Sequence, residues 1–130
     1  MKSFLRVALA ALALGLLLVG GGFASASPRV LGDFAIAATS LHGMGTVRAD
    51  LGGCFVALGL FTLFGLRRGH ARWLTVPLVF MAAFLLLRLI HLGTDGVSSE
   101  GLRSTVIEVV LLALLLAART LFKDDRQAQC

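Results

Sequence analysis

Four long apolar runs, each bounded by charged or turn residues, constrain this chain more than any other feature. They cover residues 7–24, 51–66, 73–92 and 104–122. An α-helix needs about 20 predominantly apolar residues to cross the hydrocarbon core of a bilayer. The second run is short, so its helix starts either at residue 51 or, alternatively, at residue 47. The runs therefore predict four transmembrane helices.

Length and composition exclude a separate soluble domain. Of the 130 residues, 58% are hydrophobic, and 15 more are glycine. Soluble domains have about 45–50% apolar residues with glycine included, and four spans alone use about 80 residues. We therefore expect a single membrane domain over residues 1–130, all-α, folded as an up-down four-helix bundle with crossings near +20°.

The distribution of basic residues predicts the orientation. The net charge is +5, from 12 Lys and Arg against 7 Asp and Glu. If the chain starts in the cytoplasm, the cytoplasmic segments carry Lys2, Arg6, Arg67, Arg68, Arg72, Arg119, Lys123 and Arg126, and the outer segments carry Arg29, Arg48 and Arg103. The positive-inside rule then places both termini, including a tail over residues 123–130, on the cytoplasmic side of the inner (plasma) membrane. No basic stripe is interleaved with aromatic residues, so we expect no nucleic-acid partner.

The first apolar run has two interpretations. Lys2 and Arg6 precede an apolar stretch, and Ala24-Ser25-Ala26 is typical of a signal-peptidase site. A cleaved signal peptide would leave three spans. The apolar run continues to roughly spanning length, which favours a retained helix.

Residues 25–50 form the longest segment outside the spans. Ser27 and Pro28 are typical of a helix N-cap and first helical position. Apolar residues then recur at helical spacing up to Leu41, before Gly43 and Gly45. We predict a short amphipathic surface helix between spans one and two, ended by these glycines.

Charged residues within or beside the spans define the candidate site. Arg88 and Glu108 each lie about 7 Å inside the outer ends of spans three and four, so they share one depth. An unpaired charge there costs about 2.5–3.5 kcal/mol, which favours pairing inside the bundle. The candidate polar network or pocket comprises Arg48, Asp50, Arg88, His91, Asp95 and Glu108.

Two interpretations of these charges remain open. In one, they line a pocket that opens to the outside and binds a small anion, a head group or a proton. In the other, Arg88 and Glu108 form a structural ion pair between helices.

Other features predict packing rather than chemistry. Gly52, Gly53 and Gly59 offer small residues on span two for close helix contact. Cys54 and Cys130 lie at different depths, so we expect no disulfide. The histidines have no ligand spacing, so we expect no metal site and no cofactor, and no catalytic residue is assigned.

The same positions carry a family resemblance. The chain resembles a bacterial family of small four-span membrane proteins catalogued as domain of unknown function 4345. The likeness rests on Arg48 followed by Gly52-Gly53, on Arg88 late in span three, on Asp95-Gly96 and on Glu108, and it extends from about Val30 to Phe122. The resemblance implies a multi-pass inner-membrane protein with span one retained; it implies no activity.

Three functional hypotheses follow. The leading one is a non-enzymatic multi-pass protein in the lipid bilayer, whose outer charge network is structural or binds a partner or small ligand; homo-oligomerisation is left open. The second is a small proton-coupled transporter acting as a dimer, with Glu108 as its acid. The third is a lipid enzyme with Glu108 or His91 as base, for which the sequence offers no accompanying nucleophile or metal site.

Overall fold

The computed structural model describes residues 2–67 and 70–127, with the backbone alone for residues 123–127. This part of the chain is helical and contains no strand. The elements are α1 Lys2–Ala24, α2 Pro28–Asp33, α3 Leu41–Thr46, the π-helix η1 Val47–Gly52, α4 Gly53–Leu66, the 3₁₀-helix η2 Ala71–Leu74, α5 Thr75–Thr94 and α6 Ser99–Gln127. The prediction of an all-α membrane bundle is confirmed.

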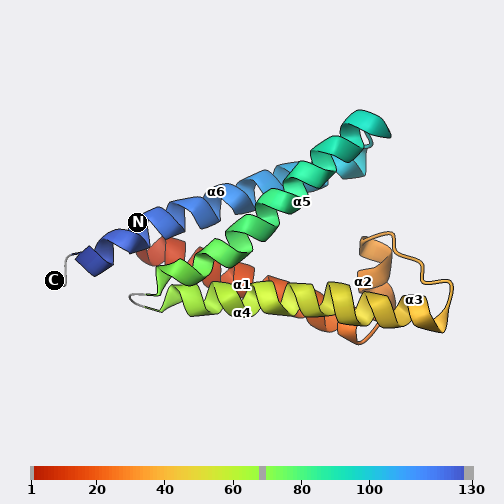
Figure 1. Ribbon diagram of the computed structural model, residues 1–130, viewed down its shortest axis with the longest axis horizontal. Helices are drawn as coiled ribbons and strands as arrows, with labels where there is room; N and C mark the ends of the chain where they lie inside the picture. Colours follow the sequence, from red (N-terminus) through yellow and green to blue (C-terminus); the bar gives the residue numbers. More distant parts are fainter. Residues whose placement is uncertain (1, 68–69, 128–130) are drawn as a thin grey trace.

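Two antiparallel helical hairpins make up the molecule (Figure 1). In the first hairpin α1 packs along η1 and α4, and in the second α5 packs along α6. The hairpins meet at the end that holds both termini, called here the terminal end. They diverge toward the loop end, which holds residues 25–40 and the turn between α5 and α6. The bundle is therefore a V and not a set of evenly packed helices.

Glycines allow the helices of the first hairpin to approach closely. A Cβ at Gly52 would lie 3.1 Å from the backbone nitrogen of Ala24, and one at Gly59 would lie 3.0 Å from the carbonyl oxygen of Ala13. The predicted packing role of these two glycines is confirmed, because side chains there would push the backbones apart. Gly53 makes no such contact within the described part of the chain, since a Cβ there meets nothing within 4 Å. Gly53 lies about 100° around the helix from Gly52 and so faces away from α1.

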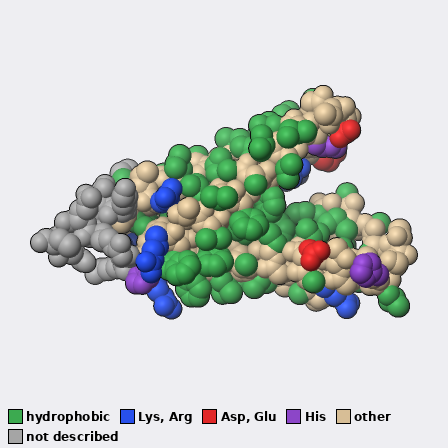
Figure 2. Space-filling model, in the orientation of Figure 1, with side chains coloured by type: hydrophobic (Ala, Val, Ile, Leu, Met, Phe, Trp, Pro, Cys, Tyr) green, Lys and Arg blue, Asp and Glu red, His purple; other side chains and the backbone are tan. Residues whose placement is uncertain are grey.

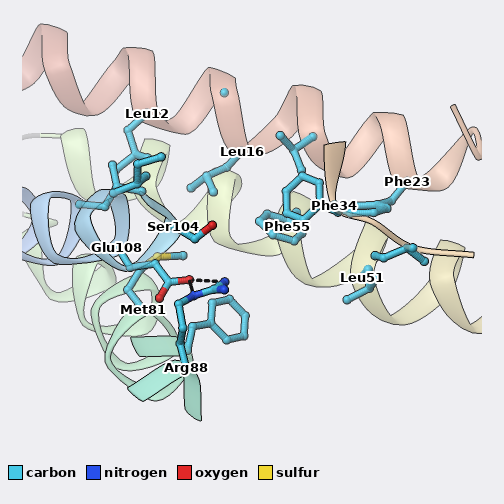
Figure 3. Close-up of a pocket in the computed structure, with 16 residues that line it drawn as sticks. Leu12, Leu16, Phe23, Phe34, Leu51, Phe55, Met81, Arg88, Ser104 and Glu108 are labelled. Atoms are coloured by element: carbon cyan, nitrogen blue, oxygen red, sulfur yellow. Dashed lines mark hydrogen bonds and ion pairs between the residues drawn. The ribbon is translucent and has the colours of Figure 1, made fainter. Parts of the chain in front are cut away.

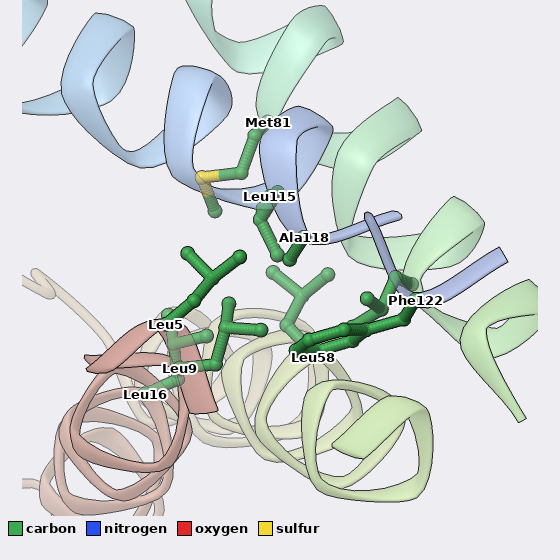
Figure 4. Close-up of a cluster of buried hydrophobic side chains, with 9 residues drawn as sticks. Leu5, Leu9, Leu16, Leu58, Met81, Leu115, Ala118 and Phe122 are labelled. Atoms are coloured by element: carbon green, nitrogen blue, oxygen red, sulfur yellow. The ribbon is translucent and has the colours of Figure 1, made fainter. Parts of the chain in front are cut away.

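The buried core joins the two hairpins at and near the terminal end (Figure 4). It consists of Leu5, Leu9, Leu16, Leu58, Leu74, Met81, Leu115, Ala118 and Phe122. Leu9, Leu74 and Ala118 have no exposed surface at all. Because α1 contributes the first three of these core residues, it is part of the packed bundle.

The rest of the apolar surface faces outward, as Figure 2 shows for one side of the molecule. Four helical stretches are long and apolar enough to cross a membrane: Lys2–Ala24, Leu41–Gly65, Ala71–Thr94 and Ser99–Phe122. Only 17% of the most apolar window of each of the last two is buried. Exposed Leu, Ile and Val side chains on this scale are stable only against lipid, so the chain is a multi-pass membrane protein.

The segment between spans one and two differs from the prediction. The surface helix starts at Pro28 as expected, but it ends at Asp33. Ala35 then adopts a left-handed φ of 52°, and the amide of Ile36 donates to the carbonyl of Leu31 at 2.9 Å. These contacts are a Schellman motif, which stops a helix even with alanine at its left-handed position.

Span two also begins earlier than predicted. The side chain of Ser40 accepts a hydrogen bond from the amide of Gly43 at 3.0 Å and so starts α3. Gly43 and Gly45 therefore lie inside a helix that runs on through η1 into α4. The N-cap offsets part of the helix-breaking tendency of glycine, which is about 1 kcal/mol per residue, and the continuous helix through η1 into α4 offsets the rest.

Candidate functional site

A cavity of about 530 Å³ lies in the cleft between the two hairpins (Figure 3). This size is within the range of about 300–1,000 Å³ that is typical of small-molecule sites. The lining comes from both hairpins and from the segment after α2: Leu12, Gly15, Leu16, Val19, Phe23, Phe34, Ile36, Leu51, Phe55, Met81, Phe84, Arg88, Ser104, Ile107, Glu108 and Leu111. All of these are apolar or glycine except Arg88, Ser104 and Glu108, called here the polar spot.

Arg88 and Glu108 form an ion pair across the second hairpin. Nε and Nη2 of Arg88 donate to Oε1 of Glu108 at 2.9 and 2.8 Å. The Glu108 side chain is 13% exposed and that of Arg88 is 34% exposed. The prediction that these two charges pair between the helices is confirmed. They lie about 9 Å from the end of α5 and about 13 Å from the start of α6.

The polar spot retains unused hydrogen-bonding capacity. Oε2 of Glu108 is buried, and no group in the described part of the chain donates to it. The hydroxyl of Ser104 lies one helical turn before Glu108 and lines the cleft. Thr105 next to it bonds back to the carbonyl of Gly101 at 2.9 Å, whereas no such bond from Ser104 is found among the described residues.

Phenylalanines from three segments form the opposite side of the cleft. The rings of Phe23 and Phe34 lie 5.0 Å apart in an edge-to-face arrangement, and Phe55 lies 5.6 Å from Phe23. Phe84 extends the cluster from α5, 6.5 Å from Phe55. Figure 3 shows Phe23, Phe34 and Phe55 across the cleft from the polar spot. Phe34 therefore ties the short segment after α2 to the loop end of the cleft.

The six predicted charged residues do not form one network. His91 bonds to Asp95 through Nδ1 and Oδ2 at 2.7 Å, in an exposed position near the end of α5. Arg48 and Asp50 lie exposed on the π-helix η1. Within residues 2–67 and 70–122, no ion pair links Arg48, Asp50 or the His91–Asp95 pair to Glu108. In the described part of the chain these six side chains therefore form no single network: Arg48 and Asp50 lie on the other hairpin, and His91 and Asp95 pair with each other near the end of α5.

Sequence reasoning missed most of the cleft. Ser104, Phe55 and Phe84 carried no signal, because a serine or phenylalanine in an apolar run is ordinary in a membrane helix. Phe34 is one of the apolar residues that recur at helical spacing after Pro28, and this periodicity is its only indication in the sequence. Cys54 is a free thiol, while Cys130 lies outside the described residues. No cluster of metal-ligating side chains occurs in the described part.

The fold and the cleft define the class of the protein: a multi-pass helical membrane protein with an apolar intramembrane cavity that contains one ion pair. No family model, curated protein or solved structure matches the chain. The resemblance to the four-span family of unknown function thus remains a prediction.

Proposed function

We propose that this chain is a non-enzymatic binding protein of the bacterial inner membrane that holds a small amphiphilic molecule in the cleft between its hairpins. One observation supports this proposal above the others. The cavity has apolar and aromatic walls, and its three polar side chains are gathered at one place. A molecule with a hydrocarbon chain and one polar end is complementary to such a surface.

The V shape supports entry from the bilayer. The hairpins are in contact at the terminal end and apart at the loop end (Figure 1), and apolar side chains cover the surface beside the cleft (Figure 2). A lipid-soluble molecule therefore has a route to the cavity that avoids water.

The proposed orientation places both termini in the cytoplasm and the cleft in the outer leaflet. Described basic residues near the terminal end are Lys2, Arg6, Arg67, Arg72 and Arg119, and those near the loop end are Arg29, Arg48 and Arg103. Aromatic rings accompany the terminal arginines: Arg72 lies 5.6 Å from the centre of the Trp73 ring, and Arg6 lies 5.3 Å from that of Phe122. Arginine beside aromatic rings is typical of a membrane interface.

Photolabelling tests the proposal. Three probes share one long acyl chain that carries a diazirine, and their heads are a glycerol ester, a carboxylate and an ammonium group. Each is added to the protein in phosphatidylcholine nanodiscs and irradiated, and labelled residues are located by mass spectrometry. We expect at least one probe to label cleft residues such as Leu16, Phe55 and Leu111 severalfold more than the outward faces of the helices.

A pair of glycine variants provides the control. A Cβ at Gly15 meets nothing within 4 Å, and Gly15 lines the cleft, so the indole of Gly15→Trp should obstruct the cavity without displacing the backbone. Gly21→Trp places the same side chain on the same helix, also in open space, but away from the cleft. Labelling should be lost in the first variant and kept in the second. Equal labelling in both would show that the probes report only lipid contact, and would overturn the proposal.

A further inference from the structure

The composition of the polar spot limits which amphiphile the cleft can hold. Among the lining residues only Arg88 and Glu108 are charged, and their charges cancel. A ligand with an anionic head would add a negative charge beside Glu108, and one with a cationic head would add a positive charge beside Arg88. In a cavity with apolar walls neither extra charge finds a partner, since the two protein charges already neutralise each other. The cleft therefore favours a head with no net charge.

The hydrogen-bonding capacity of the polar spot limits the head group of the ligand further. Both bonds from Arg88 go to Oε1 of Glu108, while Oε2 is buried with no donor in the described part of the chain. A two-fold flip of the carboxylate only exchanges its two oxygens, but the terminal torsion of a glutamate is broad, so a smaller rotation turns the buried oxygen toward the cleft. An oxygen so placed needs a donor.

Two groups near Glu108 also have unused hydrogen-bonding capacity. The Arg88 side chain is 34% exposed and has N–H groups beyond the two that bind Oε1, so it offers donors that need an acceptor. The Ser104 hydroxyl lines the cavity one turn away and both donates and accepts.

We propose that the occupant is a neutral long-chain molecule whose polar end both donates and accepts hydrogen bonds, of the chemical class of monoacylglycerols. This inference rests on the proposed function and specifies the ligand of that same cleft. A hydroxyl of the head donates to Glu108, while an ester or hydroxyl oxygen accepts from Arg88 or Ser104. The hydrocarbon chain lies along the apolar wall toward Phe23 and Phe55.

The three photoreactive probes test the head directly, because their chains are identical. In the wild-type protein we expect the monoacylglycerol probe to label the cleft at least about tenfold more efficiently than the fatty acid or the fatty amine, a difference of about 1.4 kcal/mol. Preference for either charged probe would overturn the inference. Equal labelling by all three, blocked by Gly15→Trp, would also overturn it and leave the proposed function standing.

Charge variants give the sharper test. Arg88→Gln leaves Glu108 as the lone charge, so the preference should change to the fatty amine. Glu108→Gln leaves Arg88, so the preference should change to the fatty acid. Arg103→Gln and Glu100→Gln remove the same charges from exposed positions on α6 outside the cleft, and both should keep the preference of the wild type. An unchanged preference in both cleft variants would contradict the inference.

A further variant keeps the test informative if the charge variants do not fold. Ser104→Ala removes a hydroxyl and leaves both charges, and we expect it to weaken labelling by the monoacylglycerol probe severalfold without favouring a charged probe. Undiminished labelling in this variant, together with unfolded charge variants, would count against the inference. If no probe labels the cleft, or if Gly15→Trp changes nothing, the proposed function itself fails.

Discussion

The ion pair between Arg88 and Glu108 has more than one role inside the membrane. The guanidinium directs two donors to one carboxylate oxygen, at 2.8 and 2.9 Å. This geometry neutralises both charges, and it leaves the other oxygen without a donor in the described structure. The pair therefore has a structural role, joining α5 to α6, and also gives the cleft its polar character.

The structural role predicts strong coupling between the two side chains. Arg88→Ala and Glu108→Ala should each lower the free energy of unfolding, because each leaves the other charge unpaired. The double variant should be little worse than either single variant, with a coupling energy on the order of 1–3 kcal/mol. Unfolding in detergent, followed for all four proteins, measures this. Additive losses would mean that the two charges stabilise the fold independently.

The pair was predictable from the sequence, whereas its hydroxyl neighbour was not. Counting residues from the ends of two apolar runs predicts one depth for Arg88 and Glu108. The cost of an unpaired charge in lipid then predicts that they pair. Ser104 has no such constraint, because a helical serine ordinarily satisfies its hydroxyl on the preceding turn. Its place in the cavity lining depends on how α6 packs against the first hairpin.

At the scale of helices, close approach between α1 and η1–α4 depends on which glycines face the contact. A Cβ at Gly20 would lie 2.8 Å from the backbone nitrogen of Val56 and 3.0 Å from the carbonyl oxygen of Gly52. A Cβ at Gly21 meets nothing within 4 Å. Neighbouring glycines on one helix thus have opposite roles.

This difference gives a matched pair of variants. Gly20→Ala should destabilise the protein by about 1–3 kcal/mol, since overpacking against backbone forces the helices apart. Gly21→Ala should be neutral or stabilising by up to about 1 kcal/mol, because alanine is the better helix former. Thermal unfolding of the two variants and of the wild type measures these changes in stability. Equal effects would mean that the α1–α4 contact is looser than the structure shows.

The helices themselves were predictable to different degrees. Spans one, three and four follow from hydrophobic runs alone, because length and apolarity decide insertion. The start of span two was not predictable in this way, since Gly43, Gly45 and Arg48 are typical of a loop. The structure resolves the conflict through the Ser40 cap and a π-helical turn over Val47–Gly52, neither of which hydrophobicity encodes.

At the scale of the whole molecule, the asymmetry of basic residues predicts the topology. The terminal end has more Lys and Arg than the loop end, so both termini should be cytoplasmic. Reporter fusions at the C-terminus check this: a fluorescent reporter that folds in the cytoplasm should be active, and a periplasmic phosphatase should be inactive. A matched fusion in the turn after Asp95 should give the opposite pattern. Phosphatase activity at the C-terminus would reverse the proposed orientation and place the cleft in the inner leaflet.

The V arrangement could not be predicted from the sequence. Apolar runs determine that helices cross the membrane, but lipid is as apolar as the helix surfaces, so hydrophobicity does not select which helices pair. Small residues make that selection, as Gly20, Gly52 and Gly59 do between α1 and the second span. The divergence of the hairpins, and with it the cleft, results from packing that only the assembled structure shows.

The positions of the cleft and of the buried core bear on proton transport, the alternative function in which Glu108 acts as the acid. The cleft lies toward the loop end. Near the terminal end, the interface between the hairpins is closed by buried apolar side chains, among them Leu9, Leu58, Leu115 and Phe122. A conducting path would have to pass through this apolar core, in which a proton finds no hydration in place of water. We therefore expect proteoliposomes with wild-type protein and with Glu108→Gln to show the same proton flux under an imposed pH gradient, measured with an enclosed pH-sensitive dye. A flux that is present in the wild type and lost in Glu108→Gln, with Glu100→Gln unaffected, would show that the core opens during a transport cycle and would replace static binding with transport.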